Sequence, residues 1–238
     1  MKIIKNENFI TFLWIFFGFI AFTVIGTVSH EYGHIVVAKA LGYKTTLHYG
    51  SMTYDDSALE LDIAKLYNEK TKVEGSEVEA QLRMYKQKVD KYNRDKLWVR
   101  MGGPMQTCLT GILGLLLLQW RHRKRSISGL GFLDWLAVFL ALFWLRQVFN
   151  FVVSIGSEML NPKGSYFGGD EKVISELLNI PEGTVATFLG LIGFLVLIYI
   201  VFKVIPSRLR ILFIGGGMLG GLVGFFLWMR VVGPIVLP

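Results

Sequence analysis

Two histidines and a glutamate near residue 30 could form a metal-dependent hydrolytic site. In the run HEYGH, His30 and His34 are four residues apart, so on a helix both imidazoles project from one face, one turn apart. This spacing can hold a single zinc ion. Glu31 lies beside the histidines and could take a proton from water that the metal activates. The pattern predicts zinc as the cofactor, His30 and His34 as ligands and Glu31 as the catalytic base.

The alternative is a helix that carries two surface histidines joined by a hydrogen bond. The surroundings of the run favour the metal site, because HEYGH follows an apolar stretch at residues 9–28 that is long enough to enter a membrane. A charged group at mid-membrane costs about 2.5–3.5 kcal/mol on insertion scales, so such groups are rare there unless they have a function.

The composition predicts an integral membrane protein. Of the 238 residues, 53% are hydrophobic, and the mean hydropathy is +0.47. The net charge of +7 is spread over polar segments between the apolar stretches, so we expect the lipid bilayer and no nucleic acid as a partner. Cys108 is the only cysteine, which excludes a disulfide within the chain.

Hydropathy predicts an all-α polytopic fold with five transmembrane helices, at residues 9–29, 98–120, 130–153, 184–204 and 209–230. The first helix should be an uncleaved anchor that continues to Leu41. Residues 43–54 are rich in Thr and Tyr and predict a short strand or β-hairpin. From Ser76, apolar positions spaced by three and four predict an amphipathic helix outside the bilayer. The chain thus divides into segments 1–42, 43–97, 98–183 and 184–238.

The short loops at 120–126 and 203–210 are dense in Lys and Arg. The positive-inside rule places them in the cytoplasm together with the N-terminus, in what we expect to be a bacterial cell membrane. HEYGH then lies on the extracytoplasmic side. In the last span, glycines at four-residue spacing give a smooth face for packing within the chain or in a homo-oligomer.

HEYGHIVVAKALGY at 30–43 resembles the HExGH-x-x-x-A-x-x-x-G segment of the site-2 protease family of intramembrane zinc metalloproteases. The strand-like segment is similar to the membrane-associated hairpin of that family. MGGPMQT at 101–107 is similar to its G-P-x-x-N motif, which suggests a substrate-binding or cavity-lining role for Gly103 and Pro104. Thr107 stands where the family has Asn. The family typically holds its metal nearer the cytosol, opposite to the orientation that the charges favour.

The resemblance also implies a third zinc ligand. NPKGSYFGGDE, at residues 161–171, partly matches the family motif that supplies an aspartate, which makes Asp170 the expected ligand and Asn161 a site residue. An aspartate before the helix-like EKVISELL could instead be an ordinary N-cap. In a related HExxH membrane enzyme with a glutamate ligand, Glu158 or Glu171 would replace Asp170.

The third predicted span carries the polar residues Arg146, Gln147 and Asn150. These side chains could line a water path to the metal, with Asn150 near the substrate, because polar groups in spans rarely face lipid. Arg146 could otherwise reach the interface or pair with an acid such as Glu158.

The function expected from the sequence is hydrolysis of peptide bonds in a membrane protein or peptide. The rival is a non-catalytic membrane protein that binds or transports metal, for which Glu31 would be unnecessary.

Overall fold

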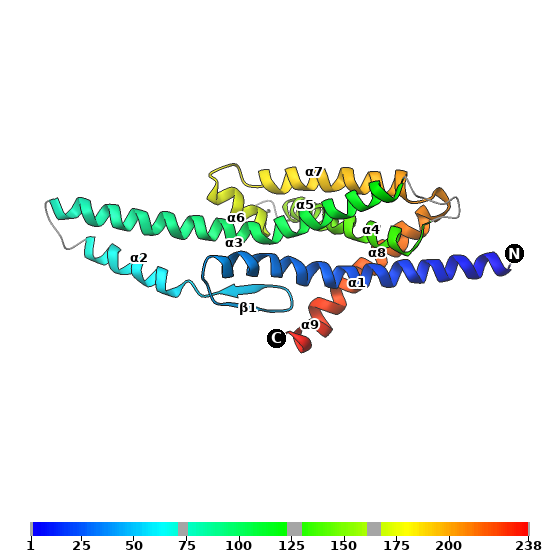
Figure 1. The fold of residues 1–238 in the computed structure, drawn as a ribbon, viewed down its shortest axis with the longest axis horizontal. Coiled ribbons are helices and arrows are strands. Elements are labelled where there is room, and N and C mark those ends of the chain that lie inside the picture. Colours follow the sequence, from blue (N-terminus) through cyan, green and yellow to red (C-terminus); the bar gives the residue numbers. More distant parts are fainter. Residues whose placement is uncertain (1, 71–75, 123–129, 161–167, 238) are drawn as a thin grey trace.

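The computed structural model describes residues 2–70, 76–122, 130–160 and 168–237. The described chain is an elongated bundle of helices with one two-stranded sheet at its side (Figure 1). The expectation of an all-α polytopic fold is confirmed. Five helices are long and apolar enough to cross a membrane: Glu7–Ala40, Val78–Arg121, Phe132–Ser157, Thr184–Val204 and Ser207–Val236. The protein is therefore described as a multi-pass membrane protein.

Helix α1 (Lys2–Ala40) contains the first span and HEYGH without a break. At 1.5 Å per residue its 39 residues extend about 58 Å, roughly twice the hydrocarbon thickness, so one end must protrude. Gly42, with a φ of +91°, allows the chain to turn after the helix. The antiparallel hairpin of β1 (Thr45–Leu47) and β2 (Met52–Tyr54) follows, as the Thr- and Tyr-rich sequence predicted.

The segment between the hairpin and the second span differs from the expectation. Helix α2 (Ser57–Lys70) was not predicted, and it packs along α3 (Ser76–His122) through an ion pair between Lys88 and Asp62. The amphipathic helix expected from Ser76 does exist, but it runs unbroken into the second span as part of α3. Its 47 residues correspond to about 70 Å, which explains why one end of α3 projects beyond the bundle in Figure 1.

The third span consists of α4 (Phe132–Ala141), a 3₁₀ turn η1 (Leu142–Trp144) and α5 (Leu145–Leu160). The short helix α6 (Gly169–Leu177) precedes α7 (Thr184–Tyr199), which ends in the π-helical turn η2 (Ile200–Val204). The 3₁₀ turn η3 (Ser207–Leu209) leads into α8 (Arg210–Leu227), and η4 (Trp228–Val232) and α9 (Gly233–Val236) complete the chain.

The glycine face of α8 packs against α1. An added Cβ at Gly224 would lie 2.9 Å from the backbone of Ile20, so glycine is needed for this approach, and one at Gly216 would press on Ile15 at 3.0 Å. Of the two uses expected for this face, packing within the chain is thus observed for Gly216 and Gly224.

The hairpin is fixed at both sides. Tyr43, just before β1, donates a 2.7 Å hydrogen bond to Asp95 of α3. In the turn, the carbonyl of Tyr49 accepts a 2.6 Å bond from the Trp228 indole, and its amide donates to the carbonyl of Leu237. The hairpin is therefore held between α3 and the C-terminal end of the chain, on the side of the molecule opposite to the N-terminus (Figure 1).

Candidate metal centre

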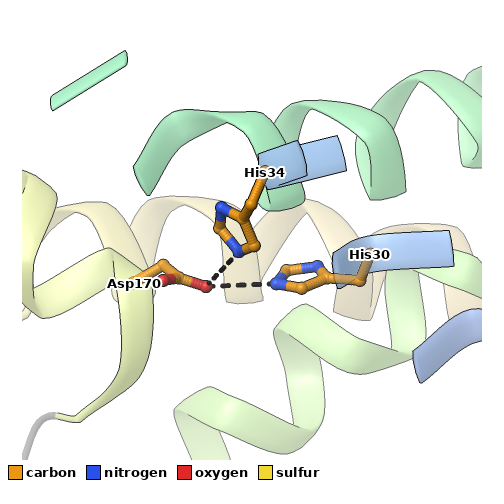
Figure 2. Close-up of side chains that lie close together, drawn as sticks. All are labelled: His30, His34 and Asp170. Carbon is orange, nitrogen blue, oxygen red and sulfur yellow. Dashed lines mark hydrogen bonds and ion pairs between the residues drawn. The ribbon is translucent and has the colours of Figure 1, made fainter. Parts of the chain in front are cut away.

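One helix and the first turn of another bring three ligand groups together. His30 and His34 lie on the later part of α1, and Asp170 lies in the first turn of α6, 140 residues from His30 (Figure 2). The Oδ2 atom of Asp170 is 3.1 Å from Nε2 of His30 and 3.1 Å from Nε2 of His34. All three ligand atoms lie within 4.8 Å of one another, and both histidines are buried.

The partners of the other ring nitrogens assign the tautomers. Nδ1 of His34 is 2.6 Å from the carbonyl of Val99, which can only accept, so this nitrogen carries the proton. The amide of Gly103 lies farther away, at 3.2 Å from the same nitrogen, and does not change the assignment. The Thr107 hydroxyl donates to the carbonyl of Gly103, and its oxygen accepts from Nδ1 of His30 at 2.9 Å.

With these tautomers, the Nε2 lone pairs of both histidines point to Oδ2 of Asp170. With the proton on Nδ1, the Nε2 atom of a neutral ring has only a lone pair, and both Nε2 atoms of His30 and His34 face a carboxylate oxygen. A cation or an additional proton must therefore sit among these three atoms. A hydrogen bond at the second ring nitrogen is also the usual support of a metal-bound histidine.

Asp170 is held so that one of its oxygens faces the rings. Arg100 donates a 3.1 Å hydrogen bond to Oδ1, and this leaves Oδ2 to the histidines. The positive charge of Arg100 favours the ionised form of this carboxyl group, which can then act as a ligand.

Gly103 supplies the space for an ion. A Cβ at this position would lie 2.5 Å from Nε2 of His30 and closer still to Nε2 of His34. Zinc binds imidazole nitrogen at about 2.0–2.1 Å, and ligand atoms of a tetrahedral site are then about 3.3 Å apart. The two contacts of Asp170 with the histidines, at 3.1 Å each, are close to two edges of such a site. The site therefore fits a small divalent metal ion.

Close helix packing produces this arrangement. A Cβ on Gly102 would lie 2.5 Å from the carbonyl of Gly33, so the backbones of α1 and α3 touch beside the two histidines. The two glycines thus have different roles. Gly102 allows α1 to pack closely against α3, and Gly103 leaves space beside the imidazole rings.

We expect Gly103→Ala to lower metal affinity by more than about 10-fold, since even the outer partners of metal ligands contribute 10- to 100-fold. The new methyl group would occupy the space between the rings without removing any ligand. The control is Gly26→Ala, on α1, where an added Cβ meets nothing within 4 Å. Competition with a chromogenic zinc chelator measures both variants. Equal affinity of Gly103→Ala and wild type would contradict the proposed use of this space.

The structure distinguishes Glu171 from Asp170 as a candidate for the third ligand. Glu171 is buried and accepts hydrogen bonds of 3.2 and 3.4 Å from Asn150, and it is outside the group that could hold a metal. Burial raises its pKa above the ordinary value. Asn150, expected near the substrate, contacts this carboxyl group instead. Asn161 and the side chain of Glu158 lie outside the described residues.

The alternative for Asp170, an ordinary N-cap, is wrong. Gly168 is the N-cap of α6, and Gly169 follows with a φ of +73°, a conformation that suits glycine. Asp170 is then the second residue of the helix, and its side chain points to the histidines (Figure 2). Pro104, expected as a cavity residue, is buried within α3.

Glu31 is 6% exposed, and Nη2 of Arg146, on α5, lies 3.9 Å from its Oε1 atom. Among the described side chains, Glu31 is thus an acid beside Arg146, where Glu158 was the example expected from the sequence. Sequence reasoning missed Arg100 and the carbonyl of Val99. Arg100 could have been noted as a base at the start of a span, three residues before Gly103, but a backbone carbonyl leaves no signal in sequence.

Comparisons of this chain with protein-family models, curated proteins and solved structures find no match.

Proposed function

We propose that this chain is an intramembrane zinc metalloendopeptidase of the site-2 protease type, which cleaves membrane proteins or membrane-associated peptides. One observation carries the proposal: two imidazole Nε2 atoms converge with a carboxylate oxygen of α6. The two histidines and Glu31 lie together on α1, a helix that is apolar enough to span a membrane. Two histidines and one carboxylate are a common protein ligand set of catalytic zinc, which leaves one position for water or substrate.

Each residue has a defined part in this proposal. When bound, zinc would polarise the scissile carbonyl and lower the pKa of a nearby water molecule towards 7. Thr107 and Val99 orient the imidazoles through their Nδ1 protons, and Arg100 orients Asp170. Glu31 takes the proton of the attacking water and later delivers it to the nitrogen of the leaving amine.

The buried position of the histidines suits a membrane substrate. The site lies in the last third of α1, so a substrate must bring its scissile bond to one end of the first span. Because His30, Glu31 and His34 are buried, charges at the site interact with one another more strongly than they would in bulk solvent.

A chelation experiment tests the proposal. The protein is reconstituted in liposomes with a panel of synthetic single-span peptides, and products are identified by mass spectrometry. We expect cleavage to stop after treatment with 1,10-phenanthroline and to return when zinc is added after the chelator is removed. Cleavage that continues in fully metal-free protein would contradict a metal-dependent mechanism.

A further inference from the structure

Arg146 is a cation in the third span, and its bonding capacity is largely unused. Its Nη2 atom is 3.9 Å from Oε1 of Glu31, beyond the 2.7–3.2 Å of an N–H···O hydrogen bond. Its Nε atom is buried and has no hydrogen-bond partner among the described residues. Arg100 provides a contrast, because it donates a 3.1 Å bond to Asp170.

The position of Arg146 is next to the metal centre. Its charge interacts electrostatically with His30, Glu31 and Glu171, and its side chain is 31% exposed although Nε is buried. A charge at this depth is costly and is normally retained for a function. If Arg146 served only to neutralise Glu31, a hydrogen-bonded pair would be expected, because buried charges are usually bonded to their partners.

We infer that Arg146 is a further catalytic residue that stabilises the oxyanion formed from the scissile carbonyl, an inference that rests on the proposed protease activity. The guanidinium group has five N–H donors and cannot lose its charge at physiological pH, which makes it suited to a developing negative charge. Its loose approach to Glu31 leaves those donors for the substrate.

The proposed reaction then proceeds in two steps. Water oxygen forms a bond to the carbonyl carbon while Glu31 takes a water proton, and the π electron pair moves to the carbonyl oxygen, beside Arg146. The oxyanion next reforms the C=O bond, the C–N bond breaks, and Glu31 returns the proton to the amine nitrogen. Arg146 bonds most strongly to the species between these steps, so it accelerates catalysis without tightening substrate binding.

The test compares Arg146→Lys and Arg146→Gln with wild type on the peptide that wild type cleaves fastest in the liposome panel. Removing one oxyanion donor typically lowers kcat by about 10²- to 10³-fold, and we expect that loss for Arg146→Gln. Arg146→Lys keeps the charge and should fall between the two. KM and zinc content should stay at wild-type values, because the interaction exists only in the transition state.

The matched control is Arg208→Gln, which changes an exposed arginine in η3, at the start of the fifth span, and should leave kcat unchanged. A kcat of Arg146→Gln equal to wild type, or a rise in KM with unchanged kcat, would overturn the inference while the protease assignment stands. If both variants lose zinc, Arg146 is a structural residue and the inference is likewise overturned. If wild type itself cleaves no peptide of the panel, the proposed function fails and this inference fails with it.

Discussion

Glu31→Gln should retain zinc and lose peptide cleavage. The amide has nearly the shape of the carboxylate, and His30, His34 and Asp170 keep their positions, but the amide cannot accept the proton of the attacking water. General acid–base groups contribute about 10²- to 10⁴-fold, so a loss of that size in kcat is expected. Reconstituted protein and the peptide panel measure the loss, and metal analysis measures the zinc.

This variant also separates the two classes of function. A protein that only binds or transports metal needs its ligands and not a base between them, so it would be unaffected by Glu31→Gln. The matched control is Glu176→Gln, on the exposed face of α6, which changes a carboxylate to an amide away from the histidines. Wild-type cleavage by Glu31→Gln would end the protease assignment.

Asp170→Asn should lower zinc affinity by more than about 100-fold, because loss of a ligand must exceed the 10- to 100-fold contributed by outer partners of ligands. The substitution also leaves the guanidinium of Arg100 without its carboxylate partner. Chelator competition gives the affinity, and cleavage should fall with it.

Glu171→Gln is the control for Asp170→Asn, since it makes the same chemical change at the neighbouring position. Glu171 contacts Asn150 and not the histidines, so its variant should bind zinc as wild type does. The opposite result, with zinc lost from Glu171→Gln and kept by Asp170→Asn, would show that the third ligand is the glutamate.

The parts of the fold that depend on local sequence were predictable. Long apolar stretches identify the five spans because a helix across the bilayer needs about 20 apolar residues. The i, i+4 spacing of His30 and His34 fixes their common face on α1. The strand-like composition of residues 43–54 also predicted the hairpin, although not its register of Thr45 with Tyr54.

The parts that depend on packing were not predictable. Helix α2 was missed because it has only 14 residues, and a helix this short is marginal by itself. It is supported by contacts with α3, such as the hydrogen bond from Tyr92 to Glu60. The role of Arg100 could not be inferred, since it needs the contact of Gly33 with Gly102 to bring α3 against α1.

Asp170 lies between these cases. The partial third motif predicted it as a ligand through resemblance, and the structure brings it to the two histidines. The alternative capping role was wrong because Gly168 is the N-cap and α6 begins at Gly169, so Asp170 lies in the first turn and its side chain reaches the rings.

The most direct test of the central claim, that His30, His34 and Asp170 form a zinc site, is the metal content of three purified proteins after saturation with zinc and removal of the excess. Wild type and Glu31→Gln should each contain about one equivalent per chain, and Asp170→Asn should contain far less, as expected for a site with three protein ligands. No bound zinc in wild type, or a full equivalent in Asp170→Asn, would contradict the account.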